Sequence, residues 1–575
     1  MQESPKNHKK IYYRLRRSDP HERLGATLRH FSFGAAVFFV VAAAGIVAHS
    51  LYNIQIKQGA TFRQYAAQQQ LMDTTIKATR GEIYDASGIT LASTSVVWTI
   101  WADPSYSSIL YTSQTAADGT VTKTLDPAMC AEVSRELTLC LLSGDGESLD
   151  TVDTSSDAYQ QQYQTVYDAL SKTDAAYVTL ATKVNNAVKL SIEQYVTAFN
   201  KAHKKATDTS RKGRISVSSE KSFQRNYPYG AFAAAVLGFT DADGVGTYGL
   251  EKSYEEDLAG TPGRSIAETN VNGEILANTE ADVHDAIDGN NLNLTLDENV
   301  QAIVEEYLAE AMDTFSVHGR GSAIVMNVKT GAILAMASLE QFDPNDPMTV
   351  YDDKMQTILD KTDALTADDI DWLEGRLGEK NVAGIIADGV ISQETTEDEN
   401  GNTISSEYTQ LQGMLREAQW KNKNITELYM PGSIFKLITA SAGLDSGIMN
   451  MNQTFYCNGE LTVNQGSELW EHTYHCANGE VHTLQNMAQA LDNSCNLWFI
   501  QAAQTLQPTV FYDYIRAFGF TQPTGVDLPS ETRWTSVYNA QQMAEVDTNL
   551  YTAAFGQNEA ITPMQMATAI AAIAN

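Results

Sequence analysis

Positive charge is scarce in most of this chain. The 575 residues carry 39 Lys and Arg against 71 Asp and Glu, a formal net charge of −32. Eight of the basic residues but only three of the acidic ones lie in the first 30 residues, so the rest of the chain has a formal charge of about −37. Because a body this acidic repels phosphates, we expect no nucleic-acid partner.

Cysteine is also rare, and internal repeats are absent. The odd count of five leaves at least one free thiol if the body lies outside the cytoplasm. Cys130 with Cys140 and Cys457 with Cys476 are conceivable disulfides, but spacing alone does not establish either pair. The lack of any fixed period excludes a solenoid or propeller of short repeats.

One segment lacks charge of either sign. No Lys, Arg, Asp or Glu occurs between Arg29 and Lys57, and residues 31–48 are almost wholly apolar, long enough with their flanks to span a bilayer as a helix. A cleaved signal peptide is the alternative, but its basic region would be unusually long and no cleavage site is convincing. The basic flank predicts a cytoplasmic tail at residues 1–30, a single transmembrane helix at 31–52, and an extracytoplasmic body on the cell membrane.

The body divides into two regions of different pattern. Residues 53–288 alternate short β-like runs, such as Ser95–Trp101, with polar helical stretches, such as Tyr159–Leu170. Residues 289–575 are mostly helical, apart from an acidic, polar insertion at about 345–418. We therefore predict an α+β protein with a mixed α/β domain followed by a second, helix-rich domain.

The second region opens with a strand, a capped helix and a hairpin. Asn291–Leu296 alternates as a strand should, and Asp297 is an N-cap for the helix that follows. Gly321–Ser338 reads as two apolar strands joined by a Lys329–Thr330–Gly331 turn. Later helices are expected at Ser433–Leu444, Thr483–Leu506 and Thr562–Ala574. The apolar side chains expected on one face of the capped helix are Val300, Ile303, Val304, Tyr307, Leu308 and Ala311.

Two short motifs carry candidate chemistry. Ser433 follows a Pro-Gly turn at the start of an apolar helix, and Lys436 lies three residues on, on the same helical face. Apolar neighbours (Ile434, Phe435 and Leu437) would disfavour the ammonium, so the amine could take the serine proton. About 60 residues downstream, Ser494-Cys495-Asn496 offers a hydroxyl and an amide that can relay a proton and hold a peptide amide. Each motif alone is weak evidence for an active site. The Ser-x-x-Lys spacing also occurs at Ser218–Lys221, where no apolar helix surrounds it.

Further short segments follow one another along roughly residues 27–575. They are RGEIYDASGITLA, RNYPYG, VLGF, YGLEKSYEEDLAGTPG, TLDENVQ, VKTGAILAMAS, FDPN, WKNKNITELYMPGSIFK, DNSCN, GFTQPTGVDLPSE and FGQNEAITPMQMA. Their order resembles that of the class B penicillin-binding proteins, the monofunctional peptidoglycan D,D-transpeptidases. The VLGF, YGLE and LAGTPG segments resemble those of division or sporulation members.

The resemblance implies a fold and a mechanism. Residues 53–288 would be a pedestal (dimerisation-type) domain, and 289–575 a transpeptidase domain with an antiparallel sheet flanked by helices. Ser433 would be the nucleophile, Lys436 its base, Ser494 the proton shuttle and Asn496 a substrate-amide ligand. The implied partners are D-Ala-D-Ala stem peptides, β-lactams, a polytopic SEDS-type glycan polymerase and other divisome proteins. No cofactor is implied.

The chain departs from the family at the third motif, Lys-Thr/Ser-Gly, which should follow Ser-x-Asn. Lys329–Thr330–Gly331 has the right letters but lies upstream of Ser433, in a predicted hairpin turn. The chain also stops after a helix that precedes this motif in the family. We therefore expect a C-terminally incomplete domain, and a chain that is inactive or severely impaired in cross-linking.

Other sites and functions were weighed against this one. His472, His475, Cys476, His482 and Cys457 could bind zinc, but their spacing fits no regular zinc module, and we favour a hairpin with chance histidines or one disulfide. No glycine loop has the strand and helix context of a phosphate site. A serine β-lactamase or penicillin sensor, and a non-catalytic cell-wall scaffold, share the fold and stay as alternatives.

Overall fold

The computed structural model describes most of the chain after the predicted membrane segment. The described residues are 40–45, 47, 49–58, 71–115, 121–144, 149–203, 214–268, 282–317, 321–339, 341–361, 363–386, 389–394, 396–397, 403–404, 406–463 and 471–575. They form two units, which are residues 1–76 with 262–286, and residues 77–261 with 287–575.

The first unit contains the segment predicted to span the membrane. Residues 31–39 of that segment lie outside the described residues, whereas most of 40–52 is helical and leads into a short π-helical turn, η1 (Asn53–Lys57). Within the part of the chain that the structure describes, every helix is too short or too polar to cross a membrane. The rest of this unit is an antiparallel sheet, β1 (Leu71–Ile76), β8 (Gly263–Glu268) and β9 (Asp282–His284), in the order β1-β8-β9.

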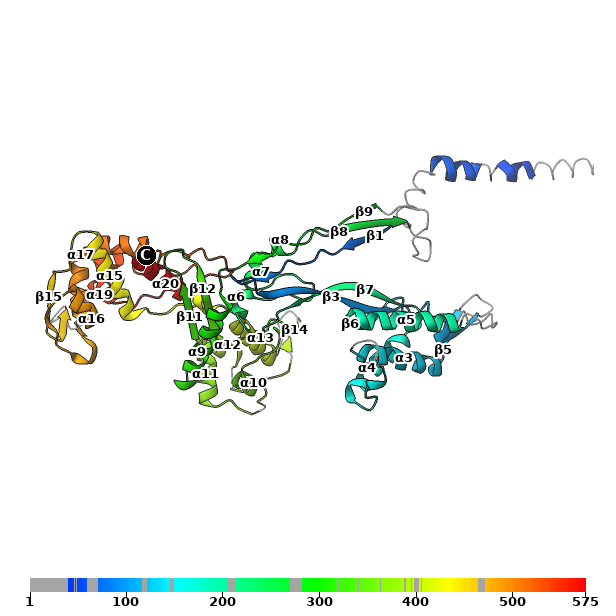
Figure 1. Ribbon diagram of the computed structural model, residues 1–575, viewed down its shortest axis with the longest axis horizontal. Coiled ribbons are helices and arrows are strands. Elements are labelled where there is room, and N and C mark those ends of the chain that lie inside the picture. Colours follow the sequence, from blue (N-terminus) through cyan, green and yellow to red (C-terminus); the bar gives the residue numbers. More distant parts are fainter. Residues whose placement is uncertain are drawn as a thin grey trace, which may run out of the picture. The chain divides into compact units, whose positions relative to one another are not determined.

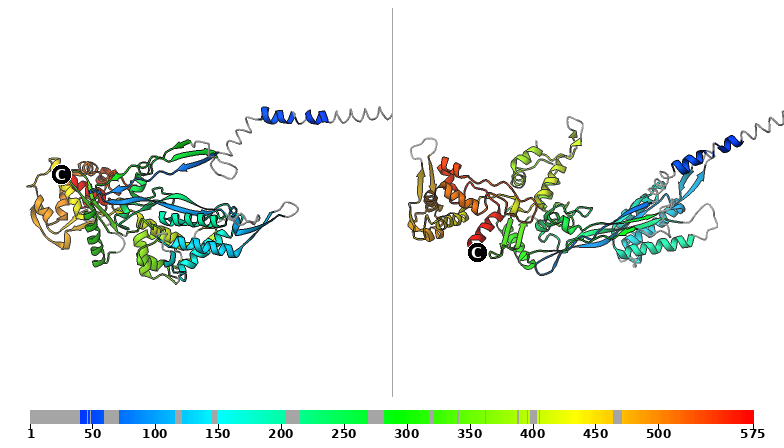
Figure 2. Two further views of the ribbon diagram at one scale, coloured as in Figure 1. Left: turned by 45° about the vertical axis from the view of Figure 1, so that its right-hand side comes forward. Right: turned by 90° about the horizontal axis from the view of Figure 1, so that it is seen from above.

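The second unit begins with a five-stranded sheet built on one long strand. β3 (Thr90–Ala102) pairs antiparallel with β2 (Ile83–Tyr84), β6 (Val178–Val184) and β7 (Val217–Asn226), and the short β10 (Leu292–Asn293) runs parallel to β2. β7 runs beside β3 in every view (Figures 1 and 2). The strand predicted at Ser95–Trp101 is confirmed as part of β3. The strand predicted at Asn291–Leu296 is confirmed only as the two residues of β10.

Three helices pack with this sheet around one apolar core. They are α3 (Pro127–Leu142), α4 (Asp157–Leu170) and α5 (Asn186–His203), accompanied by η2 (Ser108–Leu110), η3 (Leu149–Thr151) and a hairpin of β4 (Tyr111–Thr115) and β5 (Val121–Leu125). α4 confirms the helix predicted at Tyr159–Leu170. The conceivable Cys130–Cys140 disulfide is wrong: both cysteines lie on α3, where ten residues of helix separate their backbones by about 15 Å.

Three of the sequence motifs, RGEIYD, RNYPYG and YGLEK, meet at one buried carboxylate. Glu251, fully buried, accepts hydrogen bonds from Arg80 Nε at 2.6 Å, Arg225 Nε at 2.7 Å and the Tyr227 hydroxyl at 3.1 Å. Arg80 also pairs with Glu255 at 2.7 Å. The network joins the segment just before β2, the end of β7 and the short helices α7 (Gly249–Ser253) and α8 (Glu255–Leu258), which follow the short helix α6 (Ala234–Leu237) along the chain. RGEIYD, RNYPYG and YGLEK therefore depend on one another, because each segment supplies a side chain to this buried network.

The second predicted region opens as the sequence indicates. The Asp297 side chain caps α9 (Glu298–Thr314) by accepting from the Asn299 and Val300 N–H groups. β11 (Gly321–Met326) and β12 (Ile333–Leu339) form the predicted antiparallel hairpin, with Lys329–Thr330–Gly331 in its turn. The predicted apolar face of α9 is not a buried one, because Ile303 and Tyr307 are 54% and 64% exposed.

The insertion has a hydrophobic core of its own. Its helices are α10 (Asp353–Leu359), α11 (Ala367–Leu377), α12 (Glu379–Ile385) and α13 (Glu407–Trp420), with a small hairpin of β13 (Thr396–Glu397) and β14 (Thr403–Ile404). Side chains from all four helices share this core, and the yellow-green ribbon shows them grouped together (Figure 2). A segment that reads as an acidic excursion is therefore a folded helical subdomain.

The remaining elements surround the candidate chemistry. α15 (Lys436–Asp445) packs on α17 (Asn496–Ala517), and α19 (Asp547–Ala553) also contacts α17 (Figure 1). α18 (Ala540–Glu545) contacts α17 as well. The helix predicted at Thr562–Ala574 is confirmed as α20 (Pro563–Ala574), capped by Thr562. The other elements here are α14 (Lys423–Thr426), η4 (Gly432–Phe435), β15 (Thr454–Cys457), β16 (Glu460–Val463), β17 (His472–His475), η5 (Ala477–Gly479), β18 (Thr483–Asn486) and α16 (Met487–Asp492).

Candidate active site

Ser433 lies in a tight turn held by two glycines. The turn is η4, which leads directly into α15, so the predicted helix begins as one 3-10 turn. Gly432 has φ +59°, a value that favours glycine, and its N–H donates to the Gly556 carbonyl at 2.9 Å. A Cβ on Gly556 would lie 2.2 Å from the Gly432 carbonyl oxygen, so the close approach requires glycine there. The Ser433 side chain itself is exposed.

Lys436 connects the two sequence motifs. Its Nζ lies 3.1 Å from Ser433 Oγ, 2.9 Å from Ser494 Oγ and 2.7 Å from Asn496 Oδ1. It also donates to the Ser494 carbonyl at 2.6 Å, and the Ser494 hydroxyl donates to Ser433 Oγ at 3.0 Å. The structure thus brings all four predicted site residues into one hydrogen-bonded group.

Burial makes Lys436 a weaker base than an ordinary lysine. Its side chain is 1% exposed, and desolvation lowers its pKa from 10.5 to about 8, opposed in part by Cys495 and Cys476. The predicted source of this desolvation is partly wrong. Phe435 is buried, but Ile434 and Leu437 are 49% and 37% exposed, because neighbours in sequence on a helix point in different directions.

Ser494 and Asn496 lie where two helices meet. The predicted helix at Thr483–Leu506 is wrong in its first part, which is the strand β18, and it breaks between α16 and α17. Ser494 has φ +48°, an unusual value for a residue with a side chain, which costs about 1 kcal/mol and needs support from its surroundings. The Asn496 amide donates to the His475 carbonyl at 3.0 Å. That carbonyl could not be identified from the sequence, since it depends on the position of β17.

The Ser218–Lys221 decoy lies on a strand. It is part of β7, where residues three apart point to opposite faces of the sheet. Its serine and lysine are therefore not arranged like Ser433 and Lys436.

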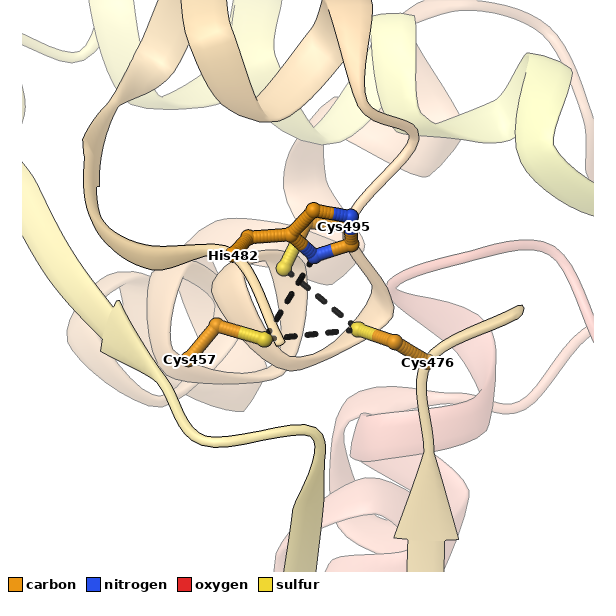
Figure 3. A group of neighbouring side chains, drawn as sticks. All are labelled: Cys457, Cys476, His482 and Cys495. Carbon is orange, nitrogen blue, oxygen red and sulfur yellow. Dashed lines mark hydrogen bonds between the residues drawn. The ribbon is translucent and has the colours of Figure 1, made fainter. Parts of the chain in front are cut away.

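The predicted zinc candidates are brought together only in part. Cys457, Cys476 and His482 meet, and they are joined by Cys495, which the sequence had suggested only as the middle residue of Ser-x-Asn (Figure 3). His472 and His475 lie outside this group of ligand atoms. The Cys457 and Cys476 sulfur atoms are 3.6 Å apart, in contact but not bonded, so the disulfide is not formed.

Comparison with known proteins identifies two domains in the chain. The model of the penicillin-binding protein transpeptidase domain matches residues 321–575, and that of the penicillin-binding protein dimerisation domain matches residues 75–294. The chain is 29% identical over 352 residues to stage V sporulation protein D of Bacillus subtilis, covering 61% of this chain and 43% of that protein. It is 36% identical over 129 residues, 22% of each chain, to the probable peptidoglycan D,D-transpeptidase PenA of Neisseria gonorrhoeae.

A solved structure shares the fold. The peptidoglycan synthetase from Bifidobacterium adolescentis matches with a TM-score of 0.52 and 22% identity, over 88% of this chain and 73% of that one. Along the chain, the match to the dimerisation domain comes first and the match to the transpeptidase domain second, and together they cover most of the residues. This arrangement defines a penicillin-binding protein with a dimerisation and a transpeptidase domain. The chain belongs to the class B penicillin-binding proteins. It spans less than half the length of stage V sporulation protein D.

Proposed function

We propose that this protein is a serine-type peptidoglycan D,D-transpeptidase that cross-links stem peptides and is acylated by β-lactams, and that acylation of Ser433 proceeds in this chain although its sequence has no Lys-Thr/Ser-Gly motif after Ser494. The observation that carries the proposal is the position of Lys436 Nζ, within 3.1 Å of Ser433 Oγ and within 2.9 Å of Ser494 Oγ. A buried amine with a lowered pKa beside an exposed hydroxyl is the arrangement that activates a serine nucleophile.

Acylation begins with the neutral amine of Lys436. Ser433 Oγ attacks the carbonyl carbon of the penultimate D-Ala while Lys436 takes the hydroxyl proton. The Ser433 backbone N–H supplies one hydrogen bond to the oxyanion that forms. The C–N bond then breaks, the leaving D-Ala amine receives a proton through Ser494, and Ser433 holds the remaining peptide as an ester.

The second half-reaction runs through the same groups. An amino group of a neighbouring stem peptide attacks the ester carbonyl, and Lys436 or Ser494 accepts the proton that this amine loses. The ester C–O bond breaks, Ser433 recovers its proton, and a new amide remains as the cross-link. Asn496 holds Lys436 through its Oδ1 atom, and we infer from the family resemblance that it also binds a substrate amide.

We infer the cellular setting from the sequence. Residues 31–52 would anchor the protein, with the basic tail in the cytoplasm and the catalytic domain outside, where peptidoglycan lies. A division or sporulation role is supported by the similarity to stage V sporulation protein D. A polytopic SEDS-type glycan polymerase and divisome proteins would be its partners in the membrane.

Covalent labelling by a fluorescent penicillin tests the proposal. We expect a stable label that is lost in Ser433→Ala and kept in Ser218→Ala, the matched control from the decoy motif. A label that persists in Ser433→Ala would show that another nucleophile reacts. Rapid turnover of the penicillin would support a β-lactamase instead.

A further inference from the structure

Four potential metal ligands converge behind the candidate active site. They come from four separate segments: the end of β15 (Cys457), the residue after β17 (Cys476), the residue before β18 (His482) and the N-cap of α17 (Cys495). The three cysteines are at most 3% exposed, and the His482 side chain is 9% exposed. Figure 3 shows the three sulfur atoms and the imidazole directed toward one another.

The distances between these atoms fit a tetrahedral ion. Cys476 Sγ lies 3.6 Å from both Cys457 Sγ and Cys495 Sγ, and Cys457 Sγ lies 3.5 Å from His482 Nδ1. Zinc–sulfur bonds of about 2.3 Å and zinc–nitrogen bonds of about 2.0 Å place tetrahedral ligands about 3.8 Å (S to S) and about 3.5 Å (S to N) apart. All four ligand atoms lie within 4.8 Å of one another, so closing the tetrahedron requires side-chain shifts of about 1 Å or less.

Two contacts outside the group also suit a metal site. The His482 Nε2 atom, on the far side of the ring from Cys457, lies 3.3 Å from Glu480 Oε2. A carboxylate in that position orients a ligating imidazole and fixes its proton on the outer nitrogen. The Trp498 backbone N–H donates to Cys495 Sγ at 3.4 Å, which stabilises a thiolate there.

We propose that Cys457, Cys476, His482 and Cys495 bind one structural Zn²⁺, and that the bound ion holds the Ser494–Asn496 segment in place for acylation of Ser433. Three thiols and one imidazole select zinc over harder ions, and each thiol releases its proton to solvent on binding. Because the protein fills all four positions and the site is buried, the ion has a structural role and no open position for catalysis.

The second part of the proposal rests on the proposed function. Cys495 is the residue between Ser494 and Asn496, so a metal bond to its sulfur constrains both neighbours. Ser494 has the unfavourable φ of +48°, and the Asn496 amide is held by the carbonyl of His475, which precedes Cys476. The ion therefore links the ends of β15, β17 and β18 to the start of α17, where the partners of Lys436 lie.

Metal analysis of the purified full chain tests the site independently of any activity. We expect about one zinc per chain by mass spectrometry of the metal, and thiolate-to-metal charge-transfer absorption when Co²⁺ replaces Zn²⁺. His482→Ala and Cys457→Ser should lose the ion. His472→Ala, an exposed histidine on the same hairpin but outside the group, should keep it, and His482→Cys should restore it as a four-cysteine site.

Two results would overturn the metal site. One is a wild-type chain without zinc in which Cys476 forms a disulfide with Cys457 or Cys495, shown by alkylation and peptide mapping. The other is wild-type zinc content in both His482→Ala and Cys457→Ser.

Removal of the ion from the wild-type chain tests its link to acylation without changing the sequence. A chelator should slow labelling by fluorescent penicillin at least tenfold, and added Zn²⁺ should restore it. The His482→Ala variant should also be labelled slowly. The His482→Cys and His472→Ala variants should be labelled at nearly the wild-type rate. Unchanged labelling after loss of zinc would refute the link and leave the site itself standing. A zinc-bound wild-type chain that never labels would refute the proposed function and, with it, the link.

Discussion

The rate of Ser433 acylation should follow the titration of Lys436. The reaction needs the neutral amine, and burial lowers the pKa of Lys436 to about 8. The neutral fraction is then about 1% at pH 6, about 10% at pH 7 and about 90% at pH 9. Acylation should therefore rise about tenfold per pH unit below pH 8 and level off above it.

The same pKa gives the size of the effect of burial. A lysine with the ordinary pKa of 10.5 would be only about 0.03% neutral at pH 7, so burial increases the reactive form about 300-fold. Because the neutral amine is the reactive form, acylation is fast above the pKa of Lys436 in the folded protein and is lost as the pH falls through that value.

The assay is the second-order rate constant for labelling by a fluorescent penicillin between pH 5.5 and 9.5. Lys436→Arg, which stays charged throughout, and Lys436→Met should both lose at least about 10³-fold in rate. The prediction concerns the shape of the profile, which is independent of the absolute rate. A flat profile would refute the role of Lys436 as the base, and a rate that still rises about tenfold per pH unit up to pH 9.5 would refute its lowered pKa.

Three further predictions concern stability, measured by denaturant unfolding of the purified chain. Glu251→Gln should destabilise the second unit by about 3 to 5 kcal/mol, because it leaves the buried Arg80 and Arg225 without their shared counter-charge; a loss below about 1 kcal/mol would contradict this. Asp297→Ala should cost about 1 kcal/mol by removing the cap of α9, and Asp297→Asn should cost much less. Burial raises the pKa of Glu559 to about 8, and neither of its carboxyl oxygens has a hydrogen-bond partner, so the carboxyl group keeps its proton on folding. Stability is therefore highest below about pH 4.5 and falls as pH rises toward 8. Glu559→Gln should therefore stabilise the chain by up to about 3 kcal/mol at pH 7 and by almost nothing at pH 4.5, and equal effects at both values would exclude this explanation.

Local signals in the sequence predicted local structure well. Asp297 before a periodic helix, the Lys329–Gly331 turn between two apolar runs and Thr562 before α20 each depend on a few neighbouring residues. The pairing of Ser433 with Lys436 is of the same kind, since one turn of helix places both on one side.

Features that depend on distant residues were the ones missed. Leu484 reads as part of a helix, but residues 483–486 pair with β15, and that pairing overrides the helical pattern. The exposed Ile303 and Tyr307 show that a periodic apolar face need not be buried. Neither outcome could be deduced from windows of neighbouring residues.

The cysteine group shows the same limit. Its ligands are separated by 19, 6 and 13 residues and lie on four segments, so no motif of fixed spacing describes them. Cys457, Cys476 and His482 could be suspected from their residue types. Cys495 could not, because its direction depends on the N-cap position at the start of α17.

The most direct test of the central claim is reaction with a stem peptide that ends in D-Ala-D-Ala. Released D-Ala would be quantified, and the chain would be digested and mapped for an acyl adduct by mass spectrometry. We predict one adduct, on Ser433, formed together with one equivalent of D-Ala, present in Ser218→Ala and absent from Ser433→Ala. An adduct on another residue, or release of D-Ala that does not require Ser433, would contradict the account.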